Sequence, residues 1–118
     1  MATIEKLAEA ALNGESLLLR SLTQDFLREC PMIADSPKPE TTDLRILAAA
    51  ASLAELLASR RNQPPPPWTS EIGALTEPVY LVKAAATMKR LRRLCETEAP
   101  EALRKRGFYA PPNFLEFA

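Results

Sequence analysis

The chain is 118 residues long, 47% of them are apolar, and its 15 Lys and Arg residues are balanced by 15 Asp and Glu residues. This length is sufficient for one hydrophobic core, and a neutral charge combined with an ordinary apolar content excludes a wholly disordered chain. The sequence contains no His, the side chain on which most acid–base catalysis near neutral pH and many zinc sites depend. We therefore expect a single helical domain over residues 1–118 that is not an enzyme and holds no cofactor or metal.

The apolar residues are spread along the chain in short runs. None of these runs is long enough for a signal peptide or for a membrane-spanning helix, which predicts a cytoplasmic protein with no membrane partner. Cys30 and Cys95 fall in apolar helical stretches without metal-ligand spacing around them. We interpret both cysteines as small core side chains and not as redox or catalytic thiols.

Three helices are expected in the N-terminal part, residues 1–62. Thr3 is suited to cap the first helix, and Gly14 is suited to end it in a left-handed conformation. Pro31 ends the second helix, and an extended connection containing further prolines follows it. The third helix contains four successive alanines, which allow neighbouring helices to approach closely and mark it as the central helix. The expected ranges are residues 3–13, 15–30 and 42–61, with Thr42 or Asp43 as the cap of the third helix.

A proline-rich connection, residues 63–77, separates the two halves of the chain. The four consecutive prolines at residues 64–67 cannot donate backbone hydrogen bonds and favour an extended polyproline II rod. We interpret the rod as a rigid linker whose neighbour Trp68 inserts into the core, because a large apolar ring gains most from burial. The alternative is a ligand for an SH3-type groove, since Pro64 and Pro67 have the PxxP spacing.

The C-terminal part, residues 78–118, is expected to begin with an amphipathic fourth helix. Pro78 suits the first turn of this helix, and an apolar stripe extends along it to Cys95. The opposite face is basic. A short fifth helix is expected between Pro100 and Gly107, and no convincing strand pattern is present. The outward cations of the fourth helix are Lys83, Lys89, Arg90 and Arg93.

Charge is unevenly divided between the halves of the sequence. Residues 1–59 carry a net charge of about −4 and residues 60–118 a net charge of about +4. Three interpretations of the basic face remain open, namely solvation with pairing to the acidic half, an acidic protein partner, and nucleic acid. The overall neutrality and the absence of a helix-turn-helix pattern favour the first two.

The last residues are rich in aromatic side chains. Phe108, Tyr109, Phe114 and Phe117 are four of the seven aromatic residues in the chain. Phe114, Leu115 and Phe117 follow two prolines that stiffen the segment. These groups either pack back across the helices as a clasp or dock into a groove on another protein, for which a second copy of the chain is one candidate.

The last part of the chain, residues 102–117 with the sequence ALRKRGFYAPPNFLEF, resembles sequences of a known kind. It is similar to the ends of small, uncharacterised helical bacterial proteins, some of which resemble antitoxin-like partners of nucleotidyltransferase-type toxins. The similarity covers at most the C-terminal third of the chain. It implies a protein partner and no catalytic residues, and neutralisation would act by protein contact alone because no operator-reading module is visible.

These observations predict an all-α fold of four to five helices in a small bundle, with a polyproline linker and an irregular aromatic C-terminal tail. We expect a non-catalytic protein-interaction module, an antitoxin-like or accessory subunit whose partner is a toxin, another protein or a second copy. The alternative is a nucleic-acid-binding regulator that uses the basic helix. The predicted partner-binding residues are Lys83, Lys89, Arg90, Arg93, Phe114, Leu115 and Phe117.

Overall fold

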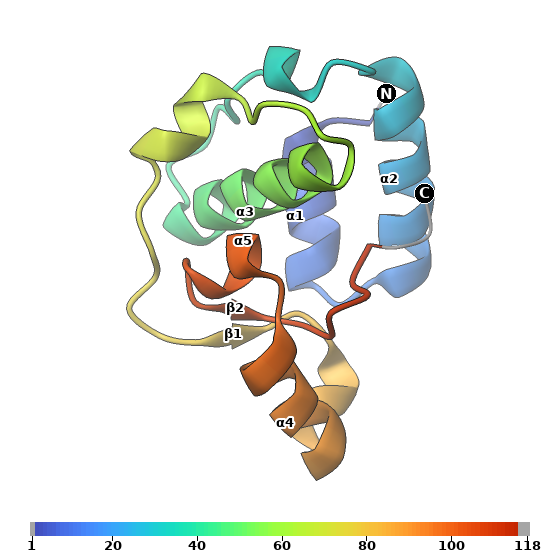
Figure 1. Ribbon diagram of the computed structural model, residues 1–118, viewed down its shortest axis with the longest axis vertical. Coiled ribbons are helices and arrows are strands. Elements are labelled where there is room, and N and C mark those ends of the chain that lie inside the picture. The colour runs from blue at the N-terminus through green and yellow to red at the C-terminus, as the bar shows by residue number, and fades with distance from the viewer. Residues whose placement is uncertain (1, 116–118) are drawn as a thin grey trace.

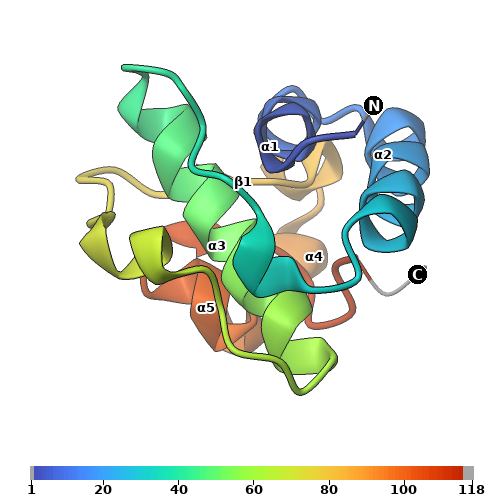
Figure 2. The same ribbon diagram turned by 90° about the horizontal axis from the view of Figure 1, so that it is seen from above.

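The computed structural model describes residues 2–115 and confirms the predicted all-α class. Within these residues five α-helices pack with α3 at the centre, and two short strands lie between α3 and α5 on one side and the projecting α4 on the other (Figure 1). Seen from above, α3 crosses the molecule between the α1–α2 pair and α5 (Figure 2). In the described residues the helices are α1 (Ile4–Leu12), α2 (Ser16–Glu29), α3 (Leu44–Arg60), α4 (Lys89–Glu98) and α5 (Glu101–Arg104). The 3₁₀ turns are η1 (Ile33–Asp35), η2 (Pro67–Glu71) and η3 (Lys83–Ala86), and the strands are β1 (Val79–Tyr80) and β2 (Phe108–Tyr109).

The N-terminal helices begin and end where local chemistry predicts. The hydroxyl of Thr3 accepts a hydrogen bond from the Lys6 N–H at 3.2 Å, which caps α1. Gly14 follows α1 with a φ of 69°, a left-handed conformation that costs glycine little. The Asp43 carboxylate caps α3 by accepting from the Arg45 N–H at 2.9 Å. These contacts confirm three predicted helix boundaries.

The alanine run of α3 is buried on all sides. Residues 48–51 are each 0–1% exposed, and α3 makes its most extensive helix contact with α1. α1 also carries buried alanines, because Ala8 and Ala11 are 0% and 2% exposed. Short side chains on both helices permit the close approach that places α3 at the centre of the core.

The proline tract is a connection, and Trp68 anchors it. The indole of Trp68 is 9% exposed, and its N–H donates to the Ser36 carbonyl at 2.8 Å. Pro66 is also buried, whereas Pro64 and Pro67, which have the PxxP spacing, are exposed. Only the end of the tract departs from an extended rod, because Pro67 begins the 3₁₀ turn η2. The predicted insertion of Trp68 into the core is confirmed.

The predicted fourth helix is wrong in its first half. The segment that follows Pro78 forms strand β1 and the 3₁₀ turn η3, and α4 begins only at Lys89. Met88, which falls within the range of the predicted fourth helix, is 55% exposed. The physical reason is tertiary, since β1 pairs in parallel with β2 in the register Val79↔Phe108. This pairing gives the backbone hydrogen-bond partners that a helical continuation would otherwise supply, and β-branched Val79 and Val82 favour an extended chain.

Arg106 ties the C-terminal part to the central helix. It is 4% exposed, and its guanidinium donates to the Thr69 carbonyl at 2.7 Å and to the Ile72 carbonyl at 3.2 Å. The same guanidinium donates to the carboxylate of Glu55 on α3, which also pairs with Lys105 at 2.8 Å. One side chain therefore joins η2, α3 and the turn after α5.

The Glu55 carboxylate is expected to make stability depend on pH. Burial disfavours its charge, but the hydrogen bonds and charges of Arg106 and Lys105 outweigh this and hold the pKa of Glu55 below its usual value. A lowered folded-state pKa stabilises the fold above the unfolded-state pKa, and that contribution is lost as pH falls through the folded-state value. Urea unfolding of Glu55→Gln should therefore show a larger loss of stability, relative to the wild type, at pH 7 than at pH 3. An equal loss at both pH values would contradict this assignment.

Two further properties concern the described part of the chain. Between residues 2 and 115, no helix combines the length and the apolar character needed to cross a membrane. Over the same residues, Cys, Asp and Glu side chains do not gather in groups of three that would suit a metal ion.

Candidate interaction groove

An apolar groove of about 460 Å³ lies where the α1–α2 turn, η3 and the C-terminal tail meet. We call it the interaction groove. Leu19 of α2 and Leu81 contribute apolar walls, and Lys83 and Ala84 of η3 form another side. Phe114 and Leu115 close it from the tail. A concave, mainly apolar surface of this size accommodates one or two side chains from a partner.

The turn between α1 and α2 places Lys83 at this groove. Gly14 and Glu15 donate N–H bonds back to the last turn of α1, at 3.2 and 3.0 Å, so the chain reverses sharply. The stem of Lys83 lies directly over Gly14, because a Cβ added at this glycine would stand 2.5 Å from the Lys83 Cε atom. The absence of a side chain at residue 14 thus leaves room for the lysine stem.

The described part of the tail packs against its own core. The Phe114 N–H donates to the Pro111 carbonyl at 3.0 Å, and Arg60 donates to the Pro112 carbonyl at 3.1 Å and also to the Phe114 carbonyl. Leu115 has a φ of 65° and is 2% exposed, while Phe114 is half-buried. Phe114 and Leu115 therefore adopt the internal clasp and not the outward docking arrangement, the two alternatives predicted for the tail.

This packing alters what each tail residue offers a partner. Leu115 does not extend toward another molecule, because its side chain is part of the wall of the groove. Phe114 keeps part of its ring accessible at the same groove. The predicted site residue Phe117 lies outside the described residues.

The remaining predicted cations lie on α4, which projects from the body of the molecule (Figure 1). Lys89, Arg90 and Arg93 are exposed, and their spacing of three and four residues places them on neighbouring parts of one face. Lys83 is not on this helix, contrary to the sequence prediction. It is the first residue of η3, and α4 packs against this turn.

A cluster that the sequence reasoning missed holds α4 against β1. The Tyr80 hydroxyl donates to Glu96 at 2.6 Å, and the guanidinium of Arg92 pairs with Glu96 at 3.2 Å and lies 5.1 Å from the centre of the Tyr80 ring. The hydrogen bond raises the pKa of Tyr80 and lowers the pKa of Glu96. The four-residue spacing of Arg92 and Glu96 was visible in the sequence, but the contribution of Tyr80 was not.

The two thiols are poorly suited to nucleophilic chemistry. Cys95 is fully buried and Cys30 is half-buried against the core. Burial raises the pKa of both thiols, and the charge of Asp35 adds to the effect at Cys30. Both side chains therefore stay protonated near neutral pH.

The structure thus brings the predicted site residues together in two neighbouring places. Lys83, Phe114 and Leu115 converge on the interaction groove, while the α4 cations form a separate surface joined to it by η3. Comparison with protein-family models, with curated proteins and with solved structures gave no match. The geometry and charge of these two surfaces are therefore the observations that bear on function.

Proposed function

We propose that the chain is a non-catalytic protein-interaction module, an antitoxin-like or accessory subunit that binds a protein partner in the cytoplasm. The observation that carries this proposal is the convergence of Lys83 and the aromatic tail on one apolar groove. The partner inserts one or two apolar side chains into this groove. Each leucine-sized group that becomes buried stabilises the complex by about 1.5–3 kcal/mol before the costs of association.

The charge of α4 favours an acidic partner surface. Lys89, Arg90 and Arg93 are exposed on α4, which packs against η3, whereas Arg92 is engaged by Glu96 and Tyr80. Exposed charges of this kind contribute little affinity in water, but they accelerate the encounter with a partner of opposite sign. The groove therefore supplies most of the binding energy and α4 raises the association rate.

Two pairs of matched variants test this proposal. Ala84→Trp places a large ring at the groove from an exposed position, while Ala86→Trp adds the same ring outside the groove lining. The second pair compares reversal of the α4 cations with reversal of three exposed cations elsewhere. The variants are Lys89→Glu, Arg90→Glu and Arg93→Glu against Lys38→Glu, Arg61→Glu and Arg104→Glu.

The measurement is affinity capture from the source organism, identification of the retained protein, and kinetics with that protein purified. We expect Ala84→Trp to weaken binding at least about tenfold and Ala86→Trp to leave it unchanged. Reversal of the α4 cations should slow association about tenfold, with a smaller change in dissociation. Equal binding by Ala84→Trp and Ala86→Trp would show that the groove is not the interface.

A nucleic-acid-binding regulator is the second candidate, favoured by the outward projection of α4 and its cations. Retention of an unrelated DNA duplex at low salt distinguishes it from protein binding. A module that binds protein alone gives no retention. Retention that falls steeply with added salt and disappears in the α4 charge-reversed variant would replace the first proposal by the second.

A further inference from the structure

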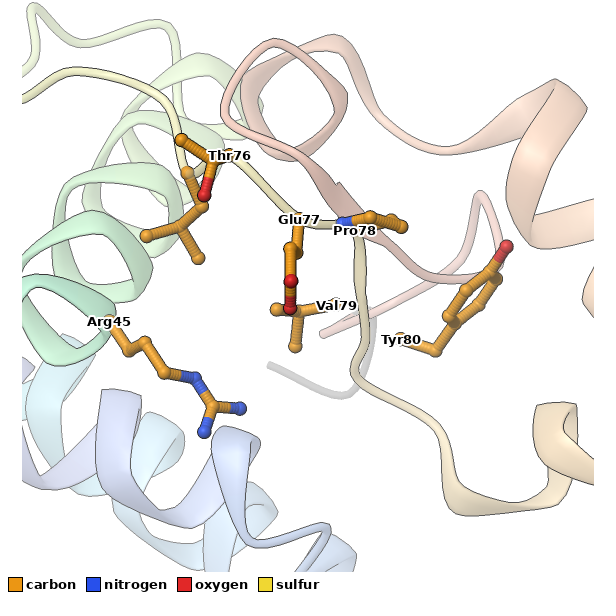
Figure 3. Close-up of a pocket in the computed structure, with 7 residues that line it drawn as sticks. Arg45, Thr76, Glu77, Pro78, Val79 and Tyr80 are labelled. Atoms are coloured by element: carbon orange, nitrogen blue, oxygen red, sulfur yellow. The ribbon is translucent and has the colours of Figure 1, made fainter.

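A hollow that holds two opposite charges lies between α3 and the segment leading into β1, and we call it the charged hollow. Its volume is about 500 Å³, and it is lined by residues 75–80 together with Arg45 of α3. Figure 3 shows the side chains of Arg45 and Glu77 projecting into it from these two elements. Leu75 and Val79 add apolar wall. The charged hollow therefore offers one cation and one anion beside an apolar surface.

The backbone that carries each charge is held in place. On the two sides of Glu77, the N–H groups of Leu75 and Val79 donate to the carbonyls of residues 106 and 107, at 3.1 and 2.8 Å. Arg45 belongs to the first turn of α3, the longest helix among the described residues. A ligand bound between the two charges would not have to order the backbone on either side, which lowers the cost of binding.

The two charges share the charged hollow without pairing. Within residues 2–115, the side chains of Arg45 and Glu77 make no hydrogen bond or ion pair. A guanidinium donates paired hydrogen bonds to a carboxylate, and a carboxylate accepts hydrogen bonds from an ammonium group. A single small molecule that carries both a carboxylate and an ammonium group would therefore satisfy both side chains.

We propose that the charged hollow binds a free α-amino acid with an apolar side chain. The carboxylate of the ligand pairs with Arg45, its ammonium group pairs with Glu77, and its side chain lies against Leu75 and Val79. This site is separate from the interaction groove, because the two have no lining residue in common.

Titration of the full-length protein with L-leucine is the first test, followed by NMR of the Val79 methyl groups and the side-chain N–H of Arg45. Two probes each lack one charge, since 4-methylpentanoate has no ammonium group and 3-methylbutylamine has no carboxylate. We expect leucine to bind at millimolar concentration and each probe to bind about threefold more weakly, because each loses one exposed ion pair. Equal binding of the three compounds, or no shift of these signals with leucine, would overturn the proposal.

Glu77→Gln and Glu9→Gln form a matched pair of variants. Glu9 is exposed like Glu77 and lines a different hollow that also includes Arg45, but it does not line the charged hollow. Glu77→Gln should weaken leucine binding about threefold without weakening the binding of 4-methylpentanoate, whereas Glu9→Gln should leave leucine binding unchanged. Equal losses for the two variants would show only a general effect of negative charge, contrary to the proposal.

A double-mutant cycle tests whether the two side chains remain unpaired in the free protein. Arg45→Gln, Glu77→Gln and the double variant should all fold, because both side chains are exposed, and their effects on urea unfolding should add. A coupling as large as that of an ordinary surface ion pair would mean that Arg45 and Glu77 bind each other, and the proposal would be wrong. None of these results bears on the Ala84→Trp test of the interaction groove.

Discussion

Replacement of Arg106 by Met is expected to lower the free energy of unfolding by about 3–5 kcal/mol. The guanidinium is 4% exposed and donates to Thr69, Ile72 and Glu55, so its removal leaves two carbonyls and a largely buried carboxylate without this donor. Lys105 still pairs with Glu55, but its single ammonium group does not replace the donors to the Thr69 and Ile72 carbonyls as well. This loss is a large part of the roughly 5–15 kcal/mol that stabilises a typical domain.

Urea unfolding followed by circular dichroism measures the effect, and Arg104→Met is the matched control. Arg104 precedes the same turn but is exposed, so this substitution should change the stability by less than about 0.5 kcal/mol. Arg106→Lys should fall between the two, because it keeps the charge and loses the forked geometry. Similar losses for Arg104→Met and Arg106→Met would mean that the anchor contributes nothing beyond its charge.

Replacement of Trp68 by Ala should cost about 3–5 kcal/mol, comparable with the loss at Arg106. The indole is 9% exposed, and its removal leaves a large cavity beneath the proline connection. The substitution also removes the N–H that donates to the Ser36 carbonyl at 2.8 Å. The loss of this bond would leave the η1 region joined to the proline connection by the hydrogen bonds of Gln63 with Pro31 and Ile33.

Trp68→Phe separates the two contributions, because it retains most of the apolar ring and removes only the donor. We expect it to cost about 1–3 kcal/mol, the usual cost of leaving a buried polar group unpaired. Thermal unfolding measures both variants. In the wild type the fluorescence of this single tryptophan should resist quenching by acrylamide. Ready quenching would contradict the buried position.

The interaction groove is assembled from three segments distant in sequence, and Leu115 closes it as a part of the core. Phe114 and Leu115, which docking would have directed outward, therefore contribute by lining the groove.

The features predicted well are those governed by neighbours in sequence. The capping side chains of Thr3 and Asp43 contact N–H groups two or three residues away, and Gly14 adopts its conformation because it lacks a Cβ. Such interactions are short-ranged, so the residues themselves carry the information. The burial of Trp68 was also predictable, because the gain from removing a large ring from water does not depend on which residues surround it.

Errors occurred where distant segments compete with local preference. The pattern from Leu81 to Cys95 has helical spacing, yet Val79 pairs with Phe108 and the helix starts only at Lys89. That strand pairing joins segments whose separation along the chain leaves no periodic signal. As a result Lys83 was assigned to a basic helix face, whereas the structure places it over Gly14 at the groove.

The amino-acid sequence by itself determined the helical class, the caps of the N-terminal helices, the central alanine-rich helix and the burial of Trp68. The tertiary structure decided the pairing of β1 with β2, the three-way anchorage of Arg106 and the gathering of Lys83, Phe114 and Leu115 around one groove. The physical reason is the distance along the chain over which each interaction acts. Capping, backbone conformation and hydrophobic gain belong to single residues and their neighbours, whereas strand pairing and a shared groove exist only when remote segments have already packed together.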